Sequence, residues 1–456
     1  MIHTTTYTLK KFALLLLSLF CLTSCDHLLA IDPKENVDSD QMYQSVRYFE
    51  LGVIGVYNNL HLEYSTLLGS IMADDCQLSS ENTGVNGYAV QLNRWIYSSD
   101  DELLHEAWKD YYHTIYKINN LLENQHRVPQ ETAIDKEKMV ALEGELKGLR
   151  AMVHFELHRI FGDSDAKTGQ ASTVPYVVDT DLYKKPGKTL KENYYHVLWD
   201  DIQAAEKQLT DTNVPTRFSL AATQALAARV ALYQKDYNRA INYASKGIDQ
   251  FPLATKEQYT ALWQQNQATE VIFKLARNNS DDLRPTTLWY NFNTGKSLFY
   301  ASSKLIQSYT GSDIRSMLFF GAEQPHQIAK YSGEYNENRI SDLPVFRTAE
   351  LYLIRAEALF NLGAQEQALA DIQALEEVRT GIVTTTLLKE ERILIERFKE
   401  LAFEGHRYFD LKRLGRTLER NSEDLATASD HSLLLFDSPL YQLPIPLKEI
   451  QSNPNL

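Results

Sequence analysis

The amino-acid sequence predicts a mainly α-helical protein that is built from pairs of helices, with long loop insertions and a few short strands. Two observations support this fold class. First, apolar side chains recur every three or four residues along four long segments, which is the spacing of a single buried helix face. These segments are residues 40–60, 102–124, 139–161 and 194–209. Second, two later segments share a pattern of small and bulky residues that is typical of a helical hairpin.

The first two helical segments show this spacing clearly. The apolar face of residues 40–60 consists of Met42, Val46, Phe49, Val53 and Val56. The apolar face of residues 102–124 consists of Trp108, Ile115, Ile118 and one of Tyr111 or Tyr112. We expect both faces to be buried, because a helix that is apolar along one side packs that side against its neighbours.

The two later segments are an internal repeat. Residues 227–247 and 356–374 each contain alanine, leucine and an aromatic residue in succession, and then a second helical stretch that begins with alanine. Small alanines allow the two helices of a hairpin to approach closely. The pattern resembles the helix pair of tetratricopeptide repeats. Long insertions separate the pairs, so we do not expect a continuous solenoid.

The insertions carry the signals of loops and short strands. Residues 74–101 and 278–299 contain glycine, asparagine and serine interleaved with aromatic residues, which predicts long loops. Residues 270–273 predict a short strand, and residues 174–177 predict a short extended piece.

The segment 391–415 combines an apolar face with a regular run of charges. Leu394, Phe398, Leu401 and Ala402 recur at helical spacing and predict a buried helix face. The charged residues Glu404, Arg407, Asp410 and Arg413 lie three apart and alternate in sign. The spacing alone predicts a solvent-facing stripe of ion pairs, because such pairs are common on helix surfaces.

The identity and order of these residues indicate more than their spacing does. The pattern E-L-x-F-E-G-x-R-x-x-D-L-x-R over residues 400–413 resembles the C-terminal signature of the SusD/RagB family of outer-membrane nutrient-binding lipoproteins. The pattern W-x-x-Y-Y-x-x-I-Y-x-I-N-N over residues 108–120 resembles the helix before that family's first repeat. The resemblance extends over nearly the whole chain. It implies a single SusD-like α-helical domain over residues 40–456.

The N-terminal segment predicts a lipid anchor. Lys10 and Lys11 precede an apolar run over residues 12–22 that is too short to span a bilayer. The run ends in Leu-Thr-Ser-Cys, which resembles a bacterial lipobox with Cys25 as the lipidated residue. We therefore expect a lipoprotein signal peptide over residues 1–24 and a lipid-anchored tether over residues 25–39. The mature protein is then expected at the cell surface, anchored in the outer membrane.

The resemblance also implies a function and a location for the ligand. Members of the family capture oligosaccharide or peptide nutrients and deliver them to a SusC-like TonB-dependent transporter barrel, without catalysis. Their ligand residues lie in two insertions that correspond to the two predicted loops here. The side chains that we expect to contact ligand are Asp75, Tyr88, Asn93, Trp95 and Tyr97 in the first loop and Trp289, Tyr290, Asn291 and Phe292 in the second. Aromatic faces stack on sugar rings, while amides and carboxylates bind the hydroxyl groups.

Composition excludes several other classes of function. The chain has 456 residues, 44% hydrophobic and 23% charged, so it can form a large core. Its formal net charge of −14 argues against a nucleic-acid partner, which requires a basic surface. Of the three cysteines, only Cys76 remains after removal of the signal peptide and lipidation of Cys25, so no intrachain disulfide is expected.

Signatures of catalysis are scarce, and we expect no cofactor and no metal. The sequence has no nucleotide-binding glycine loop, no G-x-S-x-G elbow and no H-E-x-x-H motif. His154 and His158 lie four apart on a predicted helix, but no third ligand is evident, so packing or surface roles are favoured. The acidic pairs are expected to be solvated: Asp74 with Asp75, Asp100 with Asp101, and Asp281 with Asp282. A peptide ligand, a lipid-anchored glycoside hydrolase and a periplasmic helical scaffold remain open alternatives.

Overall fold

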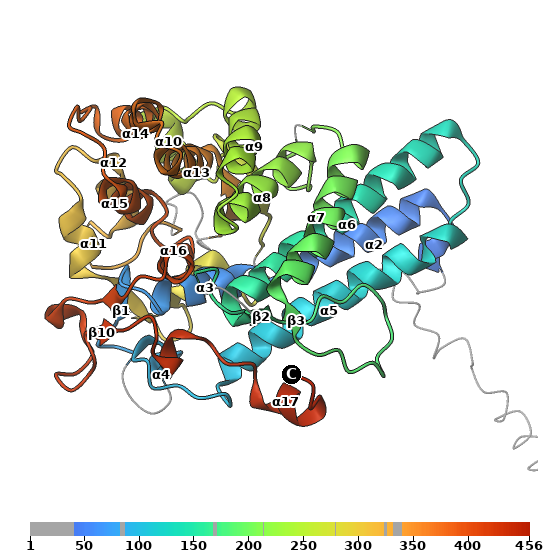
Figure 1. Ribbon diagram of the computed structural model, residues 1–456, viewed down its shortest axis with the longest axis horizontal. Helices are drawn as coiled ribbons and strands as arrows, with labels where there is room; N and C mark the ends of the chain where they lie inside the picture. Colours follow the sequence, from blue (N-terminus) through green and yellow to red (C-terminus); the bar gives the residue numbers. More distant parts are fainter. Residues whose placement is uncertain are drawn as a thin grey trace, which may run out of the picture.

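The computed structural model of the chain describes residues 41–82, 87–166, 171–212, 214–278, 280–322, 326–331 and 340–456. Helices dominate it (Figure 1). They are α2 Val46–Asn58, α3 Glu63–Ile71, α4 Val90–Asn93, α5 Glu102–Asn124, α6 Ala133–Phe161, α7 Lys191–Gln208, α8 Leu220–Tyr233, α9 Tyr237–Gln250, α10 Lys256–Gln265, α11 Ser303–Ser308, α12 Ile314–Phe319, α13 Thr348–Asn361, α14 Gln365–Thr380, α15 Glu390–Glu400, α16 Arg407–Leu414 and α17 Leu447–Ser452. The mainly α-helical fold class is confirmed.

The strands are short and pair in twos. They are β1 Cys76–Leu78, β2 Ser172–Thr173, β3 Thr189–Leu190, β4 Val271–Leu275, β5 Tyr290–Asn291, β6 Lys296–Ser297, β7 Phe299–Ala301, β8 Leu343–Arg347, β9 Leu418–Glu419 and β10 Leu433–Leu434. Antiparallel pairs form between β1 and β7, β2 and β3, β4 and β8, β5 and β6, and β9 and β10. The pairing of β1 with β7 joins the two predicted loops, which lie far apart in the sequence.

Local capping explains where the helices begin. Helix α5 has the predicted bounds, and Asp101 caps it by accepting hydrogen bonds from the backbone of its first turn. Helix α6 begins at Ala133, earlier than predicted, because Thr132 and Asp135 form a capping box that stabilises an additional turn. Residues 174–177, expected to be extended, belong to neither a helix nor a strand. The strand β2 ends at Thr173, and Pro175 has no N–H group to donate to a ladder.

The long helices are arranged as antiparallel pairs, as the internal repeat predicts. Helix α6 packs on α7, α8 on α9, and α13 on both α9 and α14. The buried face of α9 carries small residues, including Ala240, Ala244 and Gly247. A Cβ atom on Gly247 would lie 2.3 Å from Leu351 Cδ1 of α13, so a residue without a side chain is required at this crossing. The tetratricopeptide-like pairing is therefore confirmed.

One hydrophobic core extends from α2 to the segment that follows the last strands, and a smaller cluster lies between α13, α14 and α15. The expected buried residues Phe49, Val53, Trp108 and Tyr111 all belong to the large core. Cys76 is buried, and its thiol is free in the described part of the chain. Within the described ranges, no helix has both the length and the apolar character that crossing a bilayer requires. The predicted signal peptide, Cys25 and the tether lie outside the described residues.

The charges of the C-terminal motif do not form a solvent-facing stripe, so that expectation was wrong. The predicted single helix is divided into α15 and α16 by a tight turn that contains Gly405. Gly405 has φ of +75° and packs directly against the backbone of α3, where a Cβ would lie 2.4 Å from Thr66 Cα. The turn directs the four charged side chains inward. Each then pairs with another part of the chain: Glu404 with Arg347 and Lys330, Arg407 with Asp74, Asp410 with Arg397, and Arg413 with Glu357.

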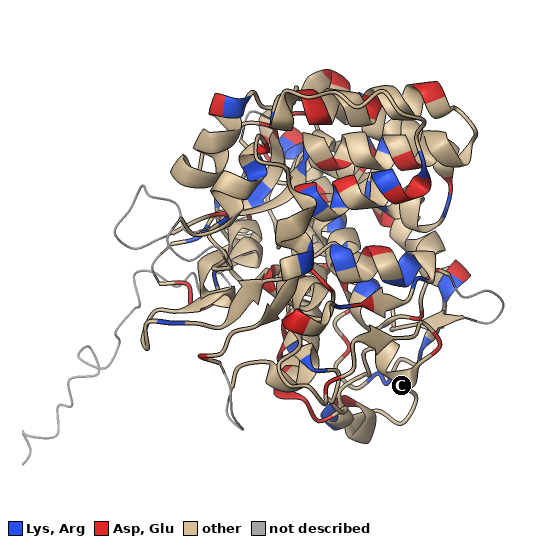
Figure 2. Cartoon of the chain, turned by 90° about the vertical axis from the view of Figure 1, so that its left-hand side faces the viewer, with Lys and Arg blue, Asp and Glu red and all other residues tan. Residues whose placement is uncertain are grey.

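Glu400 lies at the centre of this buried charge network. Its carboxylate accepts hydrogen bonds from Arg379 (3.1 Å), Arg347 (2.9 Å) and Arg315 (3.1 Å), which belong to α14, β8 and α12. Burial opposes ionisation of Glu400, yet the three guanidinium groups hold its pKa well below its ordinary value. Figure 2 shows basic and acidic residues interspersed along the helices, in keeping with this internal pairing. The network therefore ties α15 to three separate elements.

The first acidic pair is buried, which contradicts the expectation that it would be solvated. Asp74 is 1% exposed and pairs with Arg407 (2.6 Å) and Lys304 (2.7 Å). Burial would raise its pKa, but these two cations lower it to about 2. Asp75 is 0% exposed and forms no ion pair with any residue that the structure describes. Burial, followed by the charge of Asp74, raises the pKa of Asp75 to about 7. Both residues directly precede the buried strand β1 and lie in the core with it, which a sequence pattern of adjacent acids does not reveal. Of the other pairs, Asp100 and Asp282 are exposed.

The replacement Glu400→Gln tests the charge network. It removes the negative charge from a buried site where three arginines converge, so we expect the free energy of unfolding to fall by about 3–5 kcal/mol. Urea denaturation followed by circular dichroism measures this change. Glu377→Gln is the matched control, because Glu377 is exposed on α14 and should change stability by less than about 0.5 kcal/mol. Equal stability of the two variants would contradict a central role for Glu400.

The replacement Asp75→Asn tests the raised pKa of Asp75. Between its ordinary value of 3.8 and the folded value of about 7, the folded state keeps a proton that the unfolded state releases. Wild-type stability therefore loses a contribution as pH rises through this window. Relative to wild type, the variant should gain up to about 4 kcal/mol between pH 4 and pH 8. Unfolding curves over this range measure the gain, and a difference that does not change with pH would refute the assignment. The exposed Asp282→Asn serves as the control.

Candidate ligand-binding site

A cavity of about 910 Å³ lies where strands β1 and β7 meet the C-terminal part of the chain. Its walls come from β1, from β7 and α11, from residues 326–327, and from the 3₁₀ turn Ser422–Asp424 with the residues that follow it. The lining residues are Gln77, Leu78, Ser80, Tyr300, Ser303, Ile306, Gln307, His326, Gln327, Glu423, Asp424, Leu425 and Ala426. The cavity thus lies at the junction of the two loop regions in which the sequence predicts ligand contacts.

The pairing of the strands builds a row of three side chains along one wall. Gln77 of β1 lies opposite Tyr300 of β7, and Tyr300 in turn forms an isolated bridge with Gln327. Directly paired residues of neighbouring strands point to the same side. All three side chains line the cavity, and the tyrosine ring therefore has an amide on each side. A half-buried ring between two amides suits a sugar, whose C–H face stacks on the ring while its hydroxyls bind the amides.

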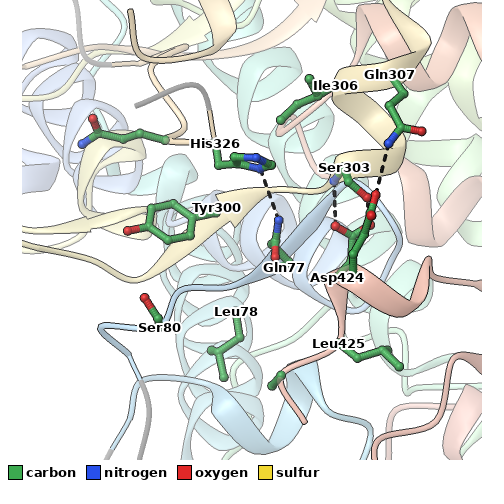
Figure 3. A pocket seen from close by; sticks show the side chains of 13 residues that line it. Gln77, Leu78, Ser80, Tyr300, Ser303, Ile306, Gln307, His326, Asp424 and Leu425 are labelled. Carbon is green, nitrogen blue, oxygen red and sulfur yellow. Dashed lines mark hydrogen bonds between the residues drawn. The ribbon is translucent and has the colours of Figure 1, made fainter. Parts of the chain in front are cut away.

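The amide of Gln77 is held in place by contacts with Ala301 and His326 (Figure 3). Its nitrogen donates to the carbonyl of Ala301 at 3.0 Å and lies 3.4 Å from Nδ1 of His326. With the nitrogen oriented in this way, the amide oxygen is the atom that remains to accept a ligand hydroxyl. His326 is exposed at the rim of the cavity.

The opposite wall is polar and is fixed by hydrogen bonds between α11 and the turn Ser422–Asp424 (Figure 3). Asp424 accepts from the backbone N–H of Ser303 at 2.7 Å and from its hydroxyl at 2.9 Å. The amide of Gln307 donates to Glu423 at 3.1 Å. Asp424 is buried and Glu423 is exposed, so Asp424 anchors the wall and Glu423 faces the open cavity. The cavity therefore has a tyrosine platform on one side and a carboxylate on the other.

Five of the nine side chains that we expected to contact ligand are instead buried. Asp75, Asn93, Trp95, Tyr97 and Trp289 have exposed fractions between 0% and 8%. The polar groups of three of them form hydrogen bonds within the fold. Asn93 donates to the carbonyl of Ile71 and Trp95 to that of Met72, each at 3.0 Å, and the Tyr97 hydroxyl donates to the carbonyl of Leu440. Trp289 packs edge to face against Phe403, with 5.7 Å between ring centroids. These five side chains lie in the interior because the loops fold back on their own aromatic residues. As ligand contacts, they remain a prediction.

The other four side chains lie at the surface but do not line the cavity. Tyr88 is 36% exposed and Phe292 is 38% exposed, while Tyr290 and Asn291 are half-buried. Tyr290 and Phe292 contact each other edge to face on the β5–β6 hairpin, with 5.1 Å between ring centroids. Asn82 fastens the two loops together by donating to the carbonyls of Tyr88 and Leu298 at 3.0 and 3.1 Å. As ligand contacts, these four remain a prediction.

Several residues that line the cavity were not among the predicted ligand contacts. Tyr300 lies one residue beyond the predicted loop 278–299, and Gln77 lies within residues 74–101 but is not aromatic. The alternation of Phe299, Tyr300 and Ala301, with the outer two buried, is a strand signal that points Tyr300 outward. No signal in the sequence pairs Tyr300 with Gln77, because their register is set by the folded structure.

The two histidines of helix α6 have packing roles, as expected. His154 stacks on Tyr176 at 3.7 Å between ring centroids, and burial lowers its pKa to about 3. His158 lies 2.9 Å from the hydroxyl of Thr173 and 3.1 Å from Asp165. Among the residues that the structure describes, no group of three or more histidine, cysteine or acidic side chains is placed to hold a metal ion.

A second cavity, of about 610 Å³, lies between α2, α6 and the segment that leads into α8. Four of its charged side chains form ion pairs with one another. Arg217 donates to Glu145 at 2.6 and 2.7 Å and to Glu50 at 3.2 Å, and Lys138 pairs with Glu50 at 2.7 Å. The hydroxyl of Tyr57 also donates to Glu145. Because these groups already satisfy one another, the 910 Å³ cavity is the better candidate for a ligand site.

Two family models match the chain. The model described as "SusD family" matches residues 303–456, and the model described as "Starch-binding associating with outer membrane" matches residues 34–232. The first match includes the C-terminal motif and the α11 and 3₁₀-turn walls of the cavity. The second includes β1 and the helices α2 to α8.

Individual relatives show the same likeness. The chain is 25% identical to SusD-like protein P38 of Formosa agariphila over 89% of this chain and 91% of that protein. A crystal structure of a SusD superfamily protein from Bacteroides thetaiotaomicron superposes with a TM-score of 0.82 at 22% identity, over 90% of this chain and 98% of that one. A putative sugar binding protein from Bacteroides vulgatus superposes with a TM-score of 0.79 at 24% identity, over 90% and 97% of the two chains. These matches confirm the resemblance of the motifs, and the chain belongs to the SusD/RagB family.

Proposed function

We propose that this protein captures an oligosaccharide nutrient at the cell surface, in the 910 Å³ cavity, and delivers it uncleaved to a SusC-like TonB-dependent transporter. The observation that carries the proposal is the row Gln77, Tyr300 and Gln327, which presents a ring between two amides to an open cavity. The family model that matches residues 34–232 has starch binding and outer-membrane association in its description, which supports the same assignment. The transporter partner follows from family membership.

Two features favour an oligosaccharide over a peptide in this cavity. A peptide that binds an exposed sheet edge requires a strand with unpaired backbone groups. Strand β7 is already paired on both sides, with β1 on one side and with Gln327 on the other. The lining also offers several amides and hydroxyls around a single ring, which matches the many hydroxyls of a sugar.

The arrangement of the cavity carboxylates supports capture without cleavage. Glycoside hydrolysis requires two carboxyl groups that face each other across the bond to be broken. Glu423 and Asp424 are consecutive residues of one 3₁₀ turn on one wall. Asp424 is engaged by the N–H and the hydroxyl of Ser303, so it anchors the wall instead of facing a substrate. The proposed role is therefore binding alone.

The proposed location rests on the N-terminal sequence and on the family. Residues 1–24 are proposed as a lipoprotein signal peptide, and Cys25 as the lipidated residue at the start of a tether that ends at residue 39. Acyl chains on Cys25 would hold the folded domain at the outer membrane, with its binding cavity in water. This arrangement agrees with the outer-membrane association in the description of the matching family model.

The replacement Tyr300→Ala tests the binding platform. Loss of the ring removes the stacking surface, so we expect affinity for a bound hexasaccharide to fall at least about tenfold, which corresponds to about 1.4 kcal/mol. Isothermal titration calorimetry on the purified full-length protein in detergent measures the affinity, and thermal unfolding shows whether the variant is folded. Tyr183→Ala is the control, because Tyr183 is 95% exposed and lies outside the cavity. Unchanged affinity of a folded Tyr300→Ala variant would exclude this platform.

The replacement Cys25→Ala tests the lipid anchor. The thioether to the lipid forms on the cysteine sulfur, so the variant should incorporate no radiolabelled palmitate and should leave the membrane fraction. Metabolic labelling followed by fractionation measures both effects. Cys76→Ala provides the comparison, because Cys76 is buried in the folded domain and its loss should leave labelling intact. Equal labelling of wild type and Cys25→Ala would refute the anchor.

A further inference from the structure

We infer that the cavity selects uncharged oligosaccharides and rejects anionic ones, such as chains of uronic acids, and that Glu423 is the residue that sets this selectivity. The inference rests on the proposed function and adds to it the charge class of the ligand. It follows from the distribution of charge around the cavity walls.

The lining of the cavity is acidic. None of its thirteen lining residues, all within the described part of the chain, is lysine or arginine, whereas Glu423 and Asp424 are acidic. Glu423 is exposed, and its contact with the Gln307 amide at 3.1 Å is a hydrogen bond from a neutral donor. A neutral donor orients a carboxylate without cancelling its charge. The charge of Glu423 therefore faces the ligand space.

Two cations adjoin this wall in the sequence, Lys304 and Arg420, and both are engaged by other groups of the protein. Lys304 of α11 donates to Asp74 at 2.7 Å and to the carbonyl of Glu419 at 2.8 Å. Arg420 is buried, donates to the carbonyls of Ala73 and Ile71 at 2.8 Å each, and lies over the ring of Trp95. These two cations balance negative charges behind the wall, and they offset part of the charge of the buried Asp424. They do not extend to a ligand in the cavity.

An anionic sugar in the cavity would meet uncompensated negative charge. A ligand carboxylate about 6 Å from Glu423 is disfavoured roughly three- to tenfold, depending on the local dielectric. The formal net charge of the whole chain, −14, adds a weaker repulsion at longer range that salt screens. A neutral hydroxymethyl group at the same place experiences neither penalty and can donate a hydrogen bond to the carboxylate.

The experiment compares one glycan in two charge states. An array of neutral hexose hexasaccharides first identifies a bound glycan for the full-length protein in detergent. Oxidation of the primary alcohols of that glycan to carboxylates then gives an anionic counterpart with the same backbone and length. Calorimetry at 20 mM and 300 mM NaCl gives both dissociation constants. We expect the oxidised glycan to bind at least about threefold more weakly at low salt, and the difference to shrink at high salt.

Two matched variants assign the effect to one residue. The ratio to compare is the dissociation constant of the oxidised glycan divided by that of the neutral glycan. In Glu423→Gln, this ratio should fall about threefold or more, because the amide keeps the shape of the side chain and loses its charge. In Glu377→Gln, which makes the same change at an exposed position of α14, the ratio should not change. Thermal unfolding shows whether both variants are folded. A ratio that is unchanged in Glu423→Gln would overturn the role of Glu423.

The outcomes separate this inference from the proposed function. An oxidised glycan that binds as tightly as its neutral parent would overturn the charge selectivity and leave capture of oligosaccharides intact. A lysine-rich hexapeptide that binds more tightly than every neutral hexasaccharide, and weakens in Glu423→Gln, would overturn the assignment to sugars. If no hexasaccharide of the array binds, the proposed function itself fails.

Discussion

The fold depends on the convergence of three arginines on the buried carboxylate of Glu400. Three charges of one sign are tolerated in the interior only because acids surround them, and Glu270, Glu396, Asp313 and Glu404 complete that set. Taking charges out of water is costly, so an incomplete network would be worse than an apolar core. The network makes α15 the element to which α12, α14 and β8 are all fastened.

The same motif connects the core to the cavity. After α15 the chain turns at Phe403 and Gly405, where Phe403 contacts Trp289 and its N–H donates to Asp75 at 3.3 Å. Asp75 directly precedes β1, which carries Gln77, and β1 pairs with β7, which carries Tyr300. The buried tryptophans and acids of the two loops are thus supports for the strands. The proposed binding surface is formed by the polar residues that alternate with them. A rigid platform of this kind limits the ordering that a ligand must impose on the protein when it binds.

Much of the fold could be predicted from the sequence, because helical periodicity and capping are local. The bounds of α5 and the pairing of α8 with α9 follow from residues that are close together in the chain. The surroundings of charged and aromatic residues could not be predicted in this way. Glu404 and Arg407 find their partners, Arg347 and Asp74, in distant segments, so their regular spacing suggested a surface stripe that does not exist. The aromatic residues of the loops drew attention to segments that pair through β1 and β7, but Trp95 and Trp289 are buried. Tyr300 reaches the proposed site through a strand register that only the folded chain defines.

The central claim is that a sugar ring stacks on Tyr300 between the amides of Gln77 and Gln327. A crystal structure of the protein with a bound hexasaccharide tests it most directly. We predict electron density for a pyranose ring parallel to the Tyr300 ring, with hydroxyl groups within hydrogen-bond distance of both amides and with the chain of sugars passing Glu423. A hexasaccharide bound elsewhere, for example in the cavity beside Glu50 and Arg217, with Tyr300 left free, would contradict the account.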